Sequence, residues 1–139
     1  MQNPIIVEAI VARELETVWN LWTGPEHVQA WNHASDDWEC PKAVSDLRVG
    51  GHFSAVMRAK DGSAEFDFNG TYTVVDQHRR IEYTMEGDRK VSVQFAPVEG
   101  GTRIVEMFEP EDMNSRELQQ AGWQSILDSF KRYAEQSDL

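Results

Sequence analysis

The sequence predicts an α+β fold in which one curved antiparallel sheet of about seven strands wraps around a long C-terminal helix, with two short helices after the first strand. Three observations support this prediction. Apolar and polar residues alternate at the period of a strand through most of the chain. The last segment has the period of a helix instead. The turns between the predicted strands are short, so neighbouring strands should be antiparallel.

The long helix is predicted over Asn114 to Gln136, with one half of its helical wheel mostly apolar and the other half polar. Asn114 can cap the first turn, and Glu117 can reach back to it. Gln119 and Gly122 interrupt the apolar half, and a glycine costs roughly 1 kcal/mol in a helix interior. We therefore expect free space and a polar partner near the start of this helix.

The first third of the chain predicts one strand and two helices. Residues 5–11 alternate as a strand, and Glu14 to Trp22 follows with helical spacing. Thr23 is the expected cap of a second short helix, with Pro25 in its first turn. Further on, Pro41 argues against a regular central strand over Trp38 to Leu47 and indicates an edge strand or a bulge.

Five further strands are predicted from Gly50 onward, with turns at Asp61-Gly62, Gly87-Asp88 and Gly100-Gly101. Gly70 indicates a bulge or a sharp bend inside one of these strands. Each strand has one face that we expect to point inward. Taken strand by strand, these inward residues are Phe53, Ala55 and Met57; Phe66, Phe68, Tyr72 and Val74; Ile81, Tyr83 and Met85; Val91, Val93 and Phe95; and Ile104, Glu106 and Phe108.

These elements should form a single domain over residues 1–139, because 139 residues are an ordinary domain length and no linker or repeat interrupts the pattern. A sheet with one apolar face, and only one long helix to cover it, is expected to curl around that helix.

Charge and composition exclude several classes of function. The net charge of −11 argues against binding nucleic acid or an anionic membrane, since both require basic patches. No apolar run approaches the ~20 residues of a membrane span, and the first residues lack the features of a signal peptide. Cys40 is the only cysteine, which is typical of a reduced cytoplasmic protein.

Four local stretches and one loop carry a family resemblance. The stretches are Val18-Trp19-Asn20-Leu21-Trp22-Thr23, Asp46-Leu47-Arg48-Val49-Gly50-Gly51-His52-Phe53, Gly70-Thr71-Tyr72 and Gly122-Trp123, and the loop is Trp31-Asn32-His33-Ala34-Ser35-Asp36-Asp37-Trp38. In its order of elements the chain resembles the helix-grip (START/Bet v-like) fold of the START-like, or SRPBCC, superfamily. The four stretches are similar to the branch named after the activator of the heat-shock-protein-90 ATPase, and the loop resembles an uncharacterised bacterial subgroup of that branch.

This resemblance implies a deep cavity between the concave sheet and the C-terminal helix, which other members of the superfamily use to hold lipids, hormones and polyketide-like molecules. The superfamily contains binding proteins and some enzymes, so the fold alone does not define the function.

Candidate ligand-binding residues follow from the inward faces, the last helix and the polar loop. Each aromatic residue among them has an alternative role in a dry core, and Trp31 and Trp38 have an alternative role as anchors of the loop. The candidates are Trp31, His33, Asp37, Trp38, Phe53, Met57, Phe66, Phe68, Tyr83, Phe95, Glu106, Gln119 and Trp123.

Two polar candidates stand out. The alternation places the Glu106 carboxylate on the inner face, where a buried charge needs a partner, a raised pKa or a ligand. A bulge of one residue would turn Glu106 to water instead. Gln119 can contact a ligand from the helix side, or it can bond a neighbouring loop.

The loop residues His33, Asp36 and Asp37 can form a base–acid pair or bind a metal, or they can simply be solvated. No standard catalytic or nucleotide-binding motif is present, and we expect no metal and no cofactor.

Three functions remain open at the level of sequence. We favour the binding of a small hydrophobic or amphipathic molecule by a monomer or homodimer, the latter paired through the edge at Trp38 to Leu47. The second is a cyclase- or hydrolase-like enzyme that uses His33, Asp37 or Glu106. The third, implied by the family resemblance, is a chaperone-ATPase activator module, which we disfavour because no partner-binding segment accompanies the domain.

Overall fold

The computed structural model describes residues 1–138. In chain order its elements are β1 (Ile5–Val11), α1 (Leu15–Thr23), α2 (Pro25–Trp31), β2 (Trp38–Ser45), β3 (His52–Ala59), β4 (Glu65–Asp76), β5 (Arg80–Met85), the 3-10 turn η1 (Glu86–Asp88), β6 (Arg89–Val98), β7 (Gly101–Phe108) and α3 (Arg116–Gln136).

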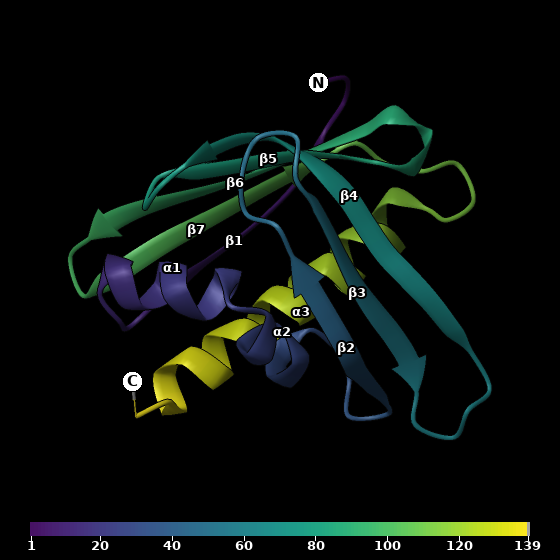
Figure 1. Ribbon diagram of the computed structural model, residues 1–139, viewed down its shortest axis with the longest axis horizontal. Helices are drawn as coiled ribbons and strands as arrows, with labels where there is room; N and C mark the ends of the chain where they lie inside the picture. Colours follow the sequence, from purple (N-terminus) through teal and green to yellow (C-terminus); the bar gives the residue numbers. More distant parts are fainter. Residues whose placement is uncertain (139) are drawn as a thin grey trace.

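The seven strands form one antiparallel sheet in the order β1-β7-β6-β5-β4-β3-β2. Figure 1 shows the sheet curving over α3, with α1 and α2 beside the helix. The predicted fold class is therefore confirmed. The pairing of β1 with β7 places the first strand between the last strand and α3, so the two ends of the chain are tied to the same edge.

The inner face of the sheet and one side of α3 form the core. On β7, Ile104 and Phe108 are fully buried, and the C-terminal half of α3 contributes Leu127, Phe130 and Ala134, also fully buried. The β6–β7 register has no irregularity, so the alternation continues through Glu106 and turns it inward. The alternative in which a bulge exposes Glu106 is wrong.

Helix α3 also seals the free edge of the sheet. The amide Nε2 atoms of Gln120 and Gln124 donate to the carbonyl oxygens of Ile6 and Glu8 at 3.2 and 3.1 Å. About two turns further along α3, the Lys131 ammonium donates to the carbonyl oxygen of Ile10. These side chains occupy the backbone acceptors of β1 that would otherwise be open to another strand.

Two predicted details of the helix starts are wrong. Ser115, not Asn114, caps α3, because its hydroxyl accepts from the amide of Leu118 at 3.1 Å. Gly24, not Thr23, is the capping position of α2. The Thr23 hydroxyl instead donates to the carbonyl of Trp19, one turn back, because Thr23 still belongs to α1.

The irregularities of the sheet fall near the predicted positions. The β2–β3 register shifts between Glu39 and Lys42, which confirms the edge strand with a bulge around Pro41. The β4–β5 register shifts between Tyr72 and Val74. Because such a shift reverses the faces of all later residues, Val75 packs against the core in place of the predicted Val74.

Two glycines have opposite surroundings. A Cβ on Gly70 would lie 2.8 Å from the carbonyl oxygen of Thr84 and 2.9 Å from the Phe53 ring, so this glycine makes room for that ring. A Cβ on Gly122 in α3 would meet no atom within 4 Å.

We predict that Gly122→Ala stabilises the protein by about 0.5–1 kcal/mol, because alanine has the higher helix propensity and free space surrounds the site. Gly70→Ala should destabilise it by about 1–3 kcal/mol, because the backbone or the Phe53 ring must move. Urea unfolding of both variants measures the two effects. A destabilised Gly122→Ala variant would contradict the open surroundings of that residue.

Candidate functional site

A cavity of about 230 Å³ lies between the sheet, α2 and the N-terminal half of α3. The residues that line it are Trp22, Val28, Trp31, Asn32, Phe53, Ala55, Met57, Phe66, Phe68, Tyr83, Glu106, Trp123 and Ile126. Ten of them are apolar, and Asn32, Tyr83 and Glu106 supply the polar atoms. The volume exceeds the ~150 Å³ of an apolar protein cavity that takes up benzene.

The β3–β4 hairpin provides one wall of the cavity. Phe53, Ala55 and Met57 alternate along β3, and Phe68 lies opposite Ala55 in the register of β4. Phe66 is 53% exposed although it lines the cavity, so it marks the mouth. In Figure 1 this hairpin extends beyond the part of the sheet that α1 covers.

Aromatic rings hold one another in place around the cavity. The Phe53 ring meets the Tyr83 ring edge to face at a centroid distance of 4.8 Å. The Trp123 ring stacks on Phe108 at 3.9 Å, with 11° between the planes, and meets Phe68 at 6.0 Å. Each ring is therefore fixed by a neighbour from another element, which favours a preformed site.

The end of α2 forms the opposite wall. The Trp31 indole N–H donates to the carbonyl oxygen of Leu21 at 3.0 Å, and the Ser129 hydroxyl donates to the carbonyl of Trp31 at 2.8 Å. These bonds join α1, α2 and α3 at one residue. They hold Trp31 and the following Asn32 against the cavity, so Trp31 both anchors the loop and lines the site.

Glu106 is the only carboxylate among the described residues that line the cavity. Its side chain is 5% exposed, and no hydrogen bond or ion pair to it is found within residues 1–138. Burial raises the pKa of Glu106 from its ordinary value of 4.5 to about 8. At neutral pH this carboxyl group is therefore mostly protonated, in an apolar wall.

Two further polar groups that line the cavity are also buried without a hydrogen-bond partner among the described residues. The Tyr83 hydroxyl and the Asn32 side-chain amide also lack a hydrogen-bond partner within residues 1–138, and both residues are at least nine-tenths buried. Burial, and after it the nearby Glu106, raise the pKa of Tyr83 well above its usual range.

Within the same residues, the Ser92 hydroxyl is the only side-chain group that is both sealed from solvent and unpaired. The polar atoms of Glu106, Tyr83 and Asn32 therefore retain some access to the cavity space.

The structure brings eight of the predicted site residues to this cavity, namely Trp31, Phe53, Met57, Phe66, Phe68, Tyr83, Glu106 and Trp123. The other five, His33, Asp37, Trp38, Phe95 and Gln119, do not line it.

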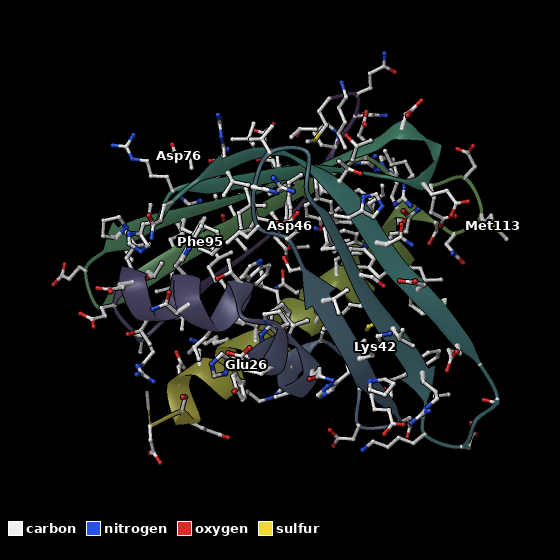
Figure 2. All side chains as sticks on the ribbon, viewed as in Figure 1. Glu26, Lys42, Asp46, Asp76, Phe95 and Met113 are labelled. Atoms are coloured by element: carbon white, nitrogen blue, oxygen red, sulfur yellow. The ribbon has the colours of Figure 1, made fainter. Side chains whose placement is uncertain are left out.

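Phe95 and Trp38 pack elsewhere. The Phe95 ring lies 5.3 Å from Trp19 and 5.9 Å from Trp22, in the core beneath α1. Figure 2 shows it on the opposite side of the molecule from the tip of the β3–β4 hairpin. Trp38 begins β2, and its ring lies 5.9 Å from the Phe66 ring.

Gln119 bonds a neighbouring loop, which is the alternative to contacting a ligand. Its Oε1 atom accepts from the amide of Glu111 at 2.9 Å, and its Nε2 atom donates to the carbonyls of Glu111 and Asn114. The side chain is thus used by the loop before α3, whose Met113 projects outward in Figure 2.

The polar loop supplies no group to the cavity. Burial is the main cause that lowers the pKa of His33, with Asp36 opposing it, while Asp37 is exposed. Neither residue lines the space that Glu106 faces, so the structure gives the cyclase- or hydrolase-like alternative no second proton-transfer group from this loop.

Five lining residues were missed at the level of sequence: Trp22, Val28, Asn32, Ala55 and Ile126. Ala55 shares the inward face of Phe53 and Met57, and Ile126 lies one helical turn from Trp123, so periodicity held a signal for both. Helical periodicity indicates that Trp22 and Val28 are buried, but the packing of α1 and α2 against the sheet decides that these two residues and Asn32 reach the cavity.

Within residues 1–138, no helix is long and apolar enough to cross a membrane. The same residues contain no group of three or more His, Cys, Asp or Glu side chains arranged to hold a metal ion. Cys40 is buried, and burial raises the pKa of its thiol, which favours the unreactive protonated form.

A curled seven-stranded sheet, a long C-terminal helix and a cavity between them define a helix-grip, START-like domain. The family model described as "Activator of Hsp90 ATPase homolog 1-like protein" matches residues 12–135, and the chain belongs to this family.

Solved structures agree with this assignment. An AHSA1-like protein from Aeromonas hydrophila is 48% identical over 95% of this chain and 92% of its own, with a TM-score of 0.90. A protein from Cytophaga hutchinsonii is 49% identical over 96% of this chain and 92% of its own, with a TM-score of 0.83. A protein from Chromobacterium violaceum, 24% identical, shares the fold over 97% of this chain and 99% of its own, with a TM-score of 0.86. A comparison with curated proteins gives no match.

We predict that Glu106→Gln removes a pH dependence of stability. Between about pH 4.5 and about pH 8 the unfolded chain has lost the Glu106 proton while the folded protein retains it, so this group lowers stability as pH rises, by about 1.4 kcal/mol per pH unit. Glutamine mimics the protonated carboxyl group. The free energy of unfolding of Glu106→Gln should therefore exceed that of the natural protein increasingly towards pH 8.

Chemical denaturation of both proteins across this pH range measures the difference, and comparing the two cancels the effect of the other acidic groups. Glu82→Gln, on the outer face of β5, is the matched control and should show no such trend. A constant difference between Glu106→Gln and the natural protein would mean that Glu106 titrates normally.

Proposed function

We propose that this domain binds one small, largely apolar molecule in the cavity between the sheet and α3, as a protein of the cytoplasm. The observation that supports the proposal is the lining itself. Ten apolar residues surround about 230 Å³, and three polar side chains among them have no hydrogen-bond partner within residues 1–138. Ligand pockets typically combine an apolar wall with a few polar groups that fix orientation.

The size of the cavity limits the ligand. It is smaller than the roughly 300–1,000 Å³ of pockets that hold drug-sized molecules. A single aromatic ring or a fused pair of rings with a short substituent fits this scale, whereas a long lipid chain would extend through the mouth at Phe66.

A role as an activator of a chaperone ATPase comes only from the description of the family. The structure offers no observation in its favour, so binding of a small molecule is the function that we propose.

We predict that indole, a neutral aromatic probe, raises the melting temperature in a concentration-dependent manner, because a ligand that binds only the folded state stabilises it. Ile126→Trp should fill the cavity and weaken this binding at least about tenfold, because the added ring occupies the space of the ligand. Thermal-shift titration followed by calorimetry measures both effects.

Leu118→Trp is the matched control, since Leu118 is 60% exposed on the same helix and does not line the cavity. It should bind indole as the natural protein does. Equal binding by Ile126→Trp, or no binding of indole and related neutral aromatics by the natural protein, would contradict the proposed function.

A further inference from the structure

The polar groups of the cavity indicate the charge of the ligand, which the proposed function does not specify. Glu106 of β7 and Tyr83 of β5 reach the cavity from the sheet, and Asn32 reaches it from the end of α2. All three are at least nine-tenths buried and lack a partner within residues 1–138. A buried polar group of this kind costs free energy unless a ligand or water satisfies it.

The cavity lining contains acidic groups but no basic side chain among the described residues. Glu106 and Tyr83 are the only titratable residues among the described residues lining the cavity, and neither carries positive charge. In the sheet, Glu106 lies between Val7 of β1 and Val93 of β6. Apart from Tyr83, the other described residues that line the cavity are Asn32 and apolar residues. Although Arg89 lies near enough to Tyr83 to oppose the rise of its pKa, no described residue of the lining is a cation. An anionic ligand would find no direct cationic partner there and would be repelled by an ionised Glu106.

The aromatic lining favours a positively charged ligand. Trp22, Trp31 and Trp123 surround the cavity together with the phenylalanines of β3 and β4, and the faces of such rings attract organic cations. The net charge of −11 also attracts cations to the protein from a distance. A neutral ligand would need only a hydrogen bond, which an uncharged amide supplies without the cost of burying an ionisable group.

Building on the proposed function, we propose that the ligand is a small organic amine whose ammonium group pairs with the Glu106 carboxylate while its apolar part lies against the aromatic lining. The Tyr83 hydroxyl and the Asn32 amide oxygen can accept the remaining N–H groups. An aromatic ring with a two-carbon amine arm matches the volume of the cavity.

Binding of an ammonium ion should release the proton that Glu106 holds in the free protein. In the free protein the Glu106 carboxyl group holds a proton at neutral pH, because its pKa is about 8. When an ammonium ion binds, Glu106 ionises and its proton leaves to the solvent, so each bound amine releases up to one proton. Above about pH 8 the free protein has already lost this proton and the release should disappear.

The experiment compares three probes of similar size: phenethylamine, 2-phenylethanol and 3-phenylpropionate. Calorimetric titrations near pH 7, in two buffers of different ionisation enthalpy, give affinity and proton release together. We expect phenethylamine to bind at least about tenfold tighter than 2-phenylethanol, because a charge-assisted bond is stronger than a neutral one. It should release close to one proton, and 3-phenylpropionate should bind weakest.

Variants separate this inference from the proposed function. Glu106→Gln retains the size and hydrogen-bonding capacity of the side chain, so it should weaken phenethylamine about 30-fold, abolish proton release and change 2-phenylethanol by less than about threefold. Glu82→Gln, on the outer face of β5, should behave as the natural protein does. A thermal melt of each variant verifies that it is folded.

Other outcomes would overturn the inference. Equal or tighter binding of 2-phenylethanol, absence of proton release, or unchanged amine binding by Glu106→Gln would each contradict it, while leaving the proposed binding of neutral molecules such as indole intact. Failure of every probe, indole included, would reject both proposals.

Discussion

One long helix, α3, must cover most of the apolar face of a seven-stranded sheet, and many features of this protein depend on how it does so. Helix α3 is fixed along the β1 edge by Gln120, Gln124 and Lys131, which bond to backbone carbonyls. Its C-terminal half is then pressed into the core through Phe130. Its N-terminal half contacts the β3–β4 hairpin only through a few side chains such as Trp123, which meets Phe68, and a cavity remains there.

The cavity is bounded by residues that are held from several elements at once. Trp31 is bonded to α1 and α3, and Trp123 is stacked on Phe108 of β7. Such mutual support keeps the walls apart and stops them collapsing into a dry core. Among the described residues that line the cavity, none carries a positive charge that could pair with Glu106.

Much of the fold could be predicted because alternation in a sheet is strict. The inward position of Glu106 followed from the pattern of β7 alone, and it is correct because the β6–β7 register is regular. The same reasoning predicted that Val74 points inward, and this prediction is wrong, since the register shift after Tyr72 reverses the faces of the residues beyond it. Eight of the thirteen candidate site residues line the cavity, whereas His33 and Asp37 do not, because nothing in a polar loop encodes the direction in which it points.

The sequence by itself determined the order of elements, the inward faces of the strands and the family resemblance, because these depend on local periodicity and short motifs. Only the tertiary structure decided that Gln119 serves a loop, that Gln120 and Gln124 seal a strand edge, and that Trp22 and Asn32 reach the cavity. A helical wheel separates apolar from polar sides, but it does not say which backbone lies opposite. That depends on contacts between residues more than one hundred positions apart, such as Gln124 and Glu8.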